Sequence, residues 1–146
     1  MSRLIKTIRL LAPALSLAMA LALPGAALAQ GPSKAECASA GLKTCKPLEE
    51  FTDKLRAAVQ GNDKDAVAAL ISYPINIQRK EDLEIKDKEA LVQHYDTIMT
   101  KSLRDAIAQE PFVHPRKIIK FVGEKAEIWL DVEKGRLLIG TIIIEE

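Results

Sequence analysis

The chain contains few of the residue types from which a recognisable site is usually built. Its 146 residues include one tryptophan, two tyrosines, three phenylalanines, two histidines and two cysteines. Aromatic residues this few and this scattered provide no stacking platform for nucleic-acid bases. Only His94 and His114 could join the two cysteines at a zinc ion, so a zinc site is not expected, and the sequence predicts no metal and no cofactor.

Several sequence motifs that carry chemistry are also missing. There is no Gly-x-Gly-x-x-Gly, no Walker loop, no Gly-x-Ser-x-Gly elbow and no His-Glu-x-x-His. These patterns mark dinucleotide sites, phosphate-binding loops, serine hydrolases and zinc proteases, respectively. The sequence therefore assigns no catalytic residue.

An excess of charge of one sign is lacking as well. The chain has 21 basic and 20 acidic residues, and three of the basic ones, Arg3, Lys6 and Arg9, precede residue 10. Residues 30–146 thus carry 18 basic against 20 acidic residues, a net charge of about −2. A nearly neutral domain has no long-range field to attract nucleic acid or an anionic membrane surface, so neither is an expected partner.

Apolar runs long enough to span a membrane are not found beyond the first 29 residues. That segment has a basic start, an apolar stretch over residues 10–23 and the small residues Ala27-Leu28-Ala29 before Gln30. This order is typical of a secretory signal peptide, here over residues 1–29 with cleavage between Ala29 and Gln30. An uncleaved membrane anchor is the alternative. We expect a periplasmic or secreted protein without stable membrane insertion after cleavage.

The two cysteines, Cys37 and Cys45, are close in sequence and follow the predicted leader. In an oxidising compartment such a pair is expected to form a disulfide. Residues 30–46 show no periodic hydrophobicity, and we expect them to be an extended lead-in held by this bridge. A redox function is the alternative, but the eight-residue spacing lacks the geometry of Cys-x-x-Cys chemistry.

Helical periodicity is clear in the first half of the remaining chain. The spacing of apolar residues predicts a helix from Pro47 that stops at Gly61, and a shorter second helix capped by Asn62. A third helix is predicted to start at Asp87 and to continue after a break at Thr100.

Strand patterns dominate the last third of the chain. A short strand is predicted at residues 75–78, followed by a charged turn from Arg79 to Glu84. Three further strands are predicted at residues 117–122, 126–133 and 136–144, joined by tight turns into an antiparallel meander. With such turns Trp129 is expected to lie between Ile119 and Gly140, and Lys117 opposite Asp131. The sheet face opposite Trp129 is expected to contain Ile118, Ile128, Leu130, Val132, Leu137, Ile139 and Ile143, and the sequence leaves open which face packs on the helices.

This order of elements, together with certain local sequences, resembles a known superfamily. The local sequences are Gly61-Asn62-Asp63, Ala66–Pro74, Ile85–Leu91 with His94-Tyr95-Asp96, and Gly123–Trp129 followed by Leu137–Ile144. They are similar to those of small exported bacterial proteins of the nuclear transport factor 2-like (NTF2-like, or cystatin-like) superfamily. The resemblance implies an α+β domain over residues 47–146. Its expected form is a cone-shaped, curved antiparallel sheet packed on about three N-terminal helices, with a pocket inside and often a homodimer through the sheet.

Four side chains are candidates for ligand binding in such a pocket: Trp129, Tyr95, His94 and Tyr73. Each also has a structural interpretation. Tyr95 shares a helical stripe with apolar residues, and the ring of Trp129 would fill the space above Gly140. Glu127 and Asp131 lie about 13 Å apart along a strand, too far to share a proton.

Three functions follow as hypotheses. The first is an exported, non-catalytic binding domain that holds a small apolar ligand or a periplasmic protein partner. The second is an enzyme of isomerase, dehydratase or hydrolase type that uses His94 or an acid beside Trp129. The third is a periplasmic inhibitor or immunity-type protein that presents the segment Arg79–Glu84. The superfamily resemblance does not choose among them, because one fold serves many activities.

Overall fold

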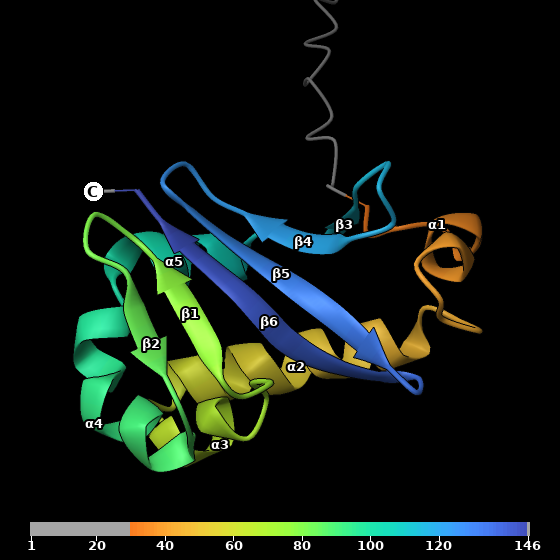
Figure 1. Ribbon diagram of the computed structural model, residues 1–146. Coiled ribbons are helices and arrows are strands. Elements are labelled where there is room, and N and C mark those ends of the chain that lie inside the picture. Colours follow the sequence, from red (N-terminus) through yellow and green to blue (C-terminus); the bar gives the residue numbers. More distant parts are fainter. Residues whose placement is uncertain (1–29, 146) are drawn as a thin grey trace, which may run out of the picture.

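The computed structural model describes residues 30–145, and this part of the chain forms five helices and six strands (Figure 1). The helices are α1 (Lys34–Ser39), α2 (Lys46–Gln60), α3 (Lys64–Ala68), α4 (Lys88–Ile98) and α5 (Lys101–Ala108). The strands are β1 (Ile75–Gln78), β2 (Leu83–Ile85), β3 (Phe112–Val113), β4 (Ile119–Val122), β5 (Ala126–Glu133) and β6 (Arg136–Ile144). The predicted signal peptide, residues 1–29, lies outside the described residues.

The six strands form one curved, open sheet in the order β2-β1-β6-β5-β4-β3. All neighbouring strands are antiparallel except β1 and β6, which run parallel. The predicted α+β class, with helices packed on a curved sheet, is therefore confirmed, whereas the sheet is mixed and not purely antiparallel. The parallel pair arises because a long connection containing α4, α5 and four strands separates β1 from β6.

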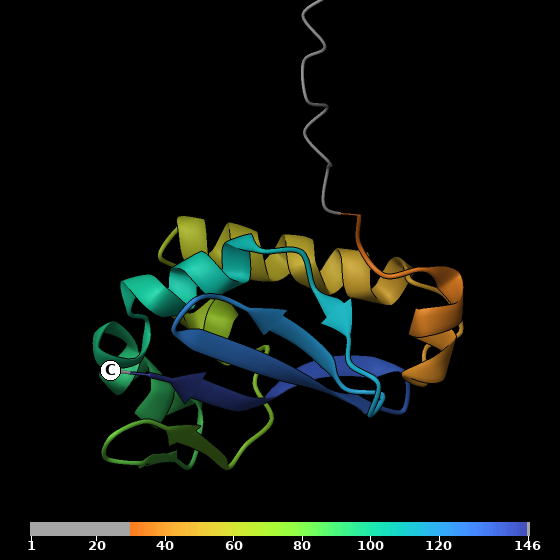
Figure 2. The same cartoon turned by 90° about the horizontal axis from the view of Figure 1, so that it is seen from above.

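Helices cover one face of the sheet, and no helix of the described chain covers the other (Figures 1 and 2). The core lies between the helices and the covered face. From β4, β5 and β6 it takes Ile119, Phe121, Ala126, Ile128, Leu130, Leu137, Ile139, Ile142 and Ile144. Ile118 and Ile143, expected on the same sheet face as the buried Ile128 and Ile139, are only partly buried. We refer to the face without helices as the open face.

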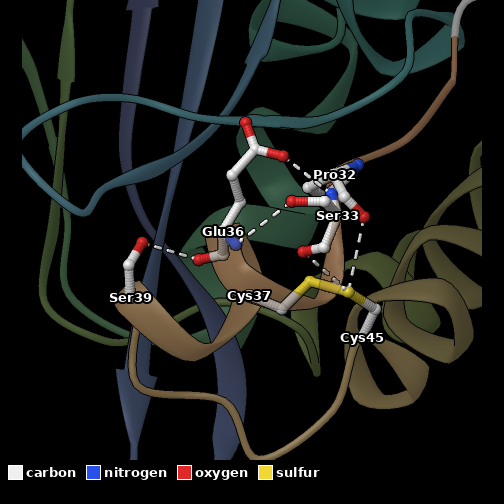
Figure 3. Close-up of a disulfide and its surroundings, with 6 residues drawn as sticks. All are labelled: Pro32, Ser33, Glu36, Cys37, Ser39 and Cys45. Atoms are coloured by element: carbon white, nitrogen blue, oxygen red, sulfur yellow. Dashed lines mark hydrogen bonds between the residues drawn. A yellow bond between two sulfur atoms is a disulfide. The ribbon is translucent and has the colours of Figure 1, made fainter.

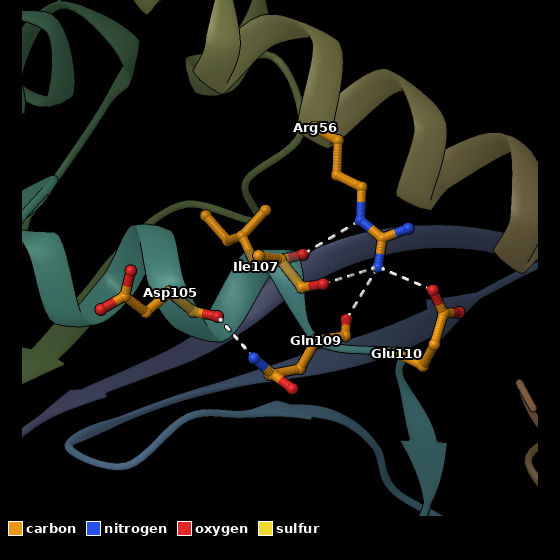
Figure 4. Close-up of polar contacts among 6 residues, drawn as sticks. Arg56, Asp105, Ile107, Gln109 and Glu110 are labelled. Atoms are coloured by element: carbon orange, nitrogen blue, oxygen red, sulfur yellow. Dashed lines mark hydrogen bonds and ion pairs between the residues drawn. The ribbon is translucent and has the colours of Figure 1, made fainter. Parts of the chain in front are cut away.

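The helix predicted from Pro47 is α2, and its apolar stripe faces the core. Leu48, Phe51 and Leu55 are at most 5% exposed. Pro47 lies in the first turn, where its missing N–H leaves no intrahelical bond unmade. Arg56 extends from this helix to the end of α5, where its guanidinium donates to the carbonyl oxygens of residues 107–109 and pairs with Glu110 (Figure 4).

The lead-in over residues 30–46 is not extended, because it contains α1. Ser33 caps this helix: its hydroxyl accepts from the backbone N–H of Glu36, and the Glu36 carboxylate accepts from the backbone N–H of Ser33 (Figure 3). This reciprocal arrangement satisfies two backbone donors in a helix of only six residues. The helix is too short to give periodic hydrophobicity, so the pattern missed it. The predicted disulfide between Cys37 and Cys45 is present and joins α1 to the start of α2.

Helix starts were predicted well, with one correction. Asp87 and Thr100 cap α4 and α5 through their side-chain oxygens, so the third predicted helix is two helices with a break at Thr100. The cap of α3 is Asp63, whose carboxylate accepts from the N–H of Ala66, and not Asn62. Asn62 instead adopts a left-handed conformation with φ of 51°, which ends the preceding turn.

The turn predicted at Arg79–Glu84 is shorter than expected. Leu83 and Glu84 belong to β2, which pairs with β1 in a hairpin. Asp82 orders the turn by accepting from the side chain of Asn76 and from the backbone N–H of Arg79, at 3.3 Å each. The segment thus comprises the turn of a hairpin and the first residues of β2.

The register between β4 and β5 differs from the predicted one. Trp129 lies opposite Lys120 and not opposite Ile119. Val122 pairs with Glu127, so four residues separate these paired positions, one more than in the expected register. A shift of one residue turns every side chain of a strand to the other face, so Phe121 enters the core and Lys120 reaches the open face.

The register between β5 and β6 is changed by a β-bulge. Neighbouring positions of β5 pair with Thr141 and then with Ile139, which leaves Gly140 as the extra residue. A Cβ atom at Gly140 would run into the carboxylate of Asp131. The glycine therefore makes room for Asp131, and not for Trp129 as predicted.

Lys117, expected in a strand opposite Asp131, lies before β4 in a turn with φ of 66°. Its backbone N–H donates to the carbonyl oxygen of His114 at 2.7 Å. The cross-strand ion pair on this part of the sheet is between Lys120 and Glu127 instead, with 3.1 Å between Nζ and Oε2.

Candidate functional site

The interior of the domain is filled by side chains. Tyr95 is 1% exposed and lies in the core among apolar residues of the helices and sheet. The cavity that it borders has a volume of about 10 Å³, which suffices for one water molecule at most. The hydroxyl of Tyr95 has no hydrogen-bond partner within the described chain. An interior pocket of ligand size, as the resemblance implied, is not formed at Tyr95.

The other two candidates, Tyr73 and His94, line neither the cavity at Tyr95 nor the groove that contains Trp129. Tyr73 is half-buried, and its hydroxyl donates to the carbonyl oxygen of Ala68 at 2.9 Å. Burial, reinforced by the negative charges of Asp87 and Glu89, raises the pKa of Tyr73 to about 12. His94 is exposed on α4. The structure therefore does not bring Tyr95, His94 and Tyr73 together with Trp129 in one site.

Trp129 lies half-buried on the open face, in contact with two charged neighbours. Its indole Nε1 donates to Oε2 of Glu127, two residues earlier in β5, at 2.7 Å. The same oxygen accepts from Nζ of Lys120 at 3.1 Å. The Lys120 ammonium is 4.0 Å from the centroid of the indole ring, within cation–π distance. We call Lys120, Glu127 and Trp129 the indole cluster.

The indole cluster shifts the pKa of its carboxylate. The hydrogen bond from Trp129 holds the pKa of Glu127 below its usual value of 4.5, and the hydrogen bond and charge of Lys120 act in the same direction. Partial burial opposes this effect. Glu127 is therefore ionised at neutral pH, a weak base whose lone pairs are already engaged.

A groove of about 450 Å³ surrounds the indole cluster on the open face. Its apolar lining comes from Ile118, Ala126 and Ile143, besides Trp129. Its polar lining consists of His114, Arg116, Lys120, Glu124, Glu127 and Glu145. This volume lies within the range of pockets that hold small ligands. We call it the open-face groove.

Sequence reasoning found Trp129 but missed Lys120, Arg116 and the groove. Lys120 lies beside Trp129 because the pairing of β4 with β5 is shifted by one residue from the expected register. Arg116 lies in a turn that begins at His114, whose Nδ1 accepts from the Arg116 backbone N–H at 3.2 Å. The segment His114-Pro115-Arg116-Lys117 contains a sequence signal for this turn, because proline favours turns. A turn here makes β4 begin at Ile119 and not at residue 117.

Two further properties of residues 30–145 bear on the site. No group of three or more His, Cys, Asp or Glu side chains in this part of the chain is arranged to hold a metal ion. Among the helices of residues 30–145, none combines the length and the apolar character needed to cross a membrane. The disulfide between Cys37 and Cys45 is of the kind that forms in oxidising compartments.

Comparison with known proteins gives likenesses of fold only. No protein family matches the sequence, and no curated protein does. A solved structure from Nostoc punctiforme, a protein of unknown function with a cystatin-like fold, matches at a TM-score of 0.47 and 11% identity, over 70% of this chain and 90% of that one. An NTF2-like protein of unknown function from Shewanella oneidensis matches at a TM-score of 0.40 and 9% identity, over 69% of this chain and 98% of that one. Both descriptions name the superfamily that the sequence resembles, while the fold class rests on the chain's own topology.

Proposed function

We propose that this chain is an exported, non-catalytic binding domain whose binding site is the open-face groove. The observation that carries the proposal is the indole cluster at the centre of a 450 Å³ hollow on the uncovered face of the sheet. An aromatic ring fixed by neighbours is a preformed contact surface, because a ligand does not have to order it on binding. The predicted leader and the disulfide support action in the periplasm or outside the cell.

The titratable groups favour binding over catalysis. A general base needs a pKa near the working pH, whereas the pKa of Glu127 is lowered. Burial raises the pKa of Asp131, but this residue lies farther along β5, outside the groove lining. His94, the base of the alternative enzymatic hypothesis, is exposed on a helix and does not line the groove.

Native mass spectrometry of the protein purified from the periplasm tests the proposal. We expect a small retained mass that is lost from a Trp129→Phe variant and kept by a Tyr95→Phe variant. Of these two residues, only Trp129 lines the open-face groove. Loss in the Tyr95 variant alone would place binding in the interior. Absence of a retained mass, with Trp129 emission unchanged by periplasmic metabolites, would contradict a small-ligand function.

The same spectrum tests the homodimer that the resemblance implied. Phe112, 42% exposed, pairs with Lys120 and so lies on the open face beside the groove. A second copy packed through this face would cover the groove. A dimeric mass without a small ligand would therefore favour assembly through the sheet, and a ligand-bearing monomer would favour the binding function.

A further inference from the structure

The two ends of the open-face groove carry opposite charges. His114 and Arg116 lie at the end where β4 begins, since the backbone N–H of His114 donates to the carbonyl oxygen of Ile118. Glu124 and Glu145 lie at the end where β4 finishes, since Glu145 is hydrogen-bonded through its backbone to Lys125. The groove is thus basic at one end and acidic at the other.

These terminal charges are not held in ion pairs, although Lys101 is near enough to Glu124 for the two charges to interact. Within residues 30–145, Arg116, Glu124 and Glu145 form no ion pair. Nδ1 of His114 accepts from a backbone N–H, so the proton of the neutral ring lies on Nε2, which is then a free donor. In contrast, Lys120 and Glu127 at the middle of the groove satisfy each other. The unmet charges are therefore those at the ends.

The separation of the ends limits what can engage both. Residues 118 and 123 flank β4, and at strand rise they lie about 16 Å apart. The charged side chains at the two ends extend into the groove, so the distance between their charged groups that a ligand has to span is shorter than this backbone separation. A single amino acid is too short, because its ammonium and carboxylate are one residue apart. A fatty acid has only one charged group and would leave the acidic end unpaired.

We infer that the open-face groove binds a short peptide with both termini free. The peptide lies extended along β4, with its carboxylate at His114 and Arg116 and its ammonium at Glu124 and Glu145. At about 3.3 Å per residue, three to five residues match the available span. The apolar floor contributed by Ile118, Trp129 and Ile143 would contact a central apolar side chain. The inference rests on the proposed binding function and specifies its ligand class.

Calorimetric titration with the tetrapeptide alanyl-alanyl-leucyl-alanine tests the inference. The free peptide is compared with its N-acetylated and C-amidated forms, each of which removes one terminal charge. Because exposed ion pairs contribute at most about 1 kcal/mol, we expect each cap to weaken binding by about two- to fivefold. Trp129 emission, measured in parallel, reports whether the peptide occupies the groove.

Charge variants assign each end. In Arg116→Ala the acid and amide forms should bind equally, while the acetyl group still weakens binding. In the double variant Glu124→Gln with Glu145→Gln, the free and N-acetylated peptides should bind equally, while amidation of the C-terminus still weakens binding. Matched controls are Arg104→Ala on α5 and Glu81→Gln in the β1–β2 turn, which should leave both cap effects intact. All five residues are exposed, so these variants should unfold at the same urea concentration as the parent.

Equal binding of the free and capped peptides would overturn the inference, as would cap effects that persist in the charge variants. Lack of any binding at millimolar peptide would also overturn it. The proposed function can survive that failure: a small mass that is retained by the native protein and lost in Trp129→Phe would establish binding at the groove by a ligand of another class.

Discussion

Trp129 has its orientation set by charged groups and not by burial in a core. The Glu127 carboxylate accepts from the indole and from Lys120, so one oxygen joins all three side chains. Lys120 is only 12% exposed, and its ammonium lies over the ring. Together these contacts hold an aromatic surface in place on a face that no helix of the described chain covers.

The emission of Trp129 should report the ionisation of Glu127. The chain has a single tryptophan, and protonation of Glu127 weakens the acceptor of its indole N–H. We expect an emission change centred below pH 4.5, the usual value for a glutamate, because the pKa of Glu127 is lowered. A Glu127→Gln variant should lack this transition. A midpoint above 4.5, or a transition that persists in the variant, would contradict the assignment.

Tyr73 should make the stability of the fold sensitive to alkaline pH. Its pKa is about 12 in the folded chain, against 10 ordinarily. Below pH 10 the hydroxyl of Tyr73 keeps its proton in the folded and the unfolded chain, and its contribution to the free energy of unfolding is complete. Between pH 10 and 12 the unfolded chain deprotonates first, so the free energy of unfolding should fall as the pH rises.

Urea titrations of the parent and of Tyr73→Phe at pH 9 and pH 11 measure this effect. The variant loses the hydrogen bond to Ala68, which costs about 1 kcal/mol at the lower pH. The difference in the free energy of unfolding between the parent and the variant should be smaller at pH 11 than at pH 9. A constant difference would show that Tyr73 keeps an ordinary pKa.

At the scale of elements, one side chain of α2 forms hydrogen bonds to the end of α5. Arg56 of α2 donates to the carbonyl oxygens of Ile107, Ala108 and Gln109, which lack partners within the helix at the end of α5 (Figure 4). A cation at this position also opposes the negative end of the helix dipole. Arg56 thus caps one helix from another, and Glu110 balances its charge.

Replacement of Arg56 should destabilise the fold. We expect Arg56→Met to lower the free energy of unfolding by about 1 to 3 kcal/mol, because several carbonyl groups lose a charged donor. Arg56→Lys keeps the charge but not the planar fork, and should fall between the parent and the methionine variant. Urea denaturation measures both. Lys54→Met, exposed on the same helix, should change stability by less than about 0.5 kcal/mol. Equal effects at residues 54 and 56 would refute the capping role.

At the scale of the whole molecule, the chain encloses a filled core on one side of its sheet and leaves the other side open. The α1 segment extends this body: Cys37 and Leu42 are buried against it, and the disulfide fixes α1 to α2 (Figure 3). The lead-in is therefore part of the folded domain and not a tether to it.

Removal of the disulfide should cost stability without abolishing the fold. In the chain-entropy account, opening so short a loop costs about 2 to 3 kcal/mol. We expect this loss for the double variant Cys37→Ala with Cys45→Ala, measured by urea denaturation. Hydrogen exchange should accelerate in residues 34–39 first and leave β5 protected. Unchanged stability, or uniform acceleration over the chain, would argue against a local role for the bridge.

The sequence predicted most elements because their signals are local. Asp87 and Thr100 cap their helices through bonds to residues three positions away, and the stripe of α2 repeats at helical spacing. The pairing of Cys37 with Cys45 needed only proximity and an oxidising compartment. The two shortest strands and α1 were missed, because two to six residues are too few to show a period.

The sequence by itself determined helices α2 to α5, the meander, the disulfide and the α+β class, since each depends on neighbours along the chain. Only the tertiary structure decided the register of β4 and β6, and with it the surroundings of Trp129. A β4–β5 connection longer by one residue placed Lys120 beside the indole, and a bulge at Gly140 shifted the pairing of β6 with β5. Strand side chains alternate between faces, so a shift of one residue decides whether a charged group meets the core or the groove.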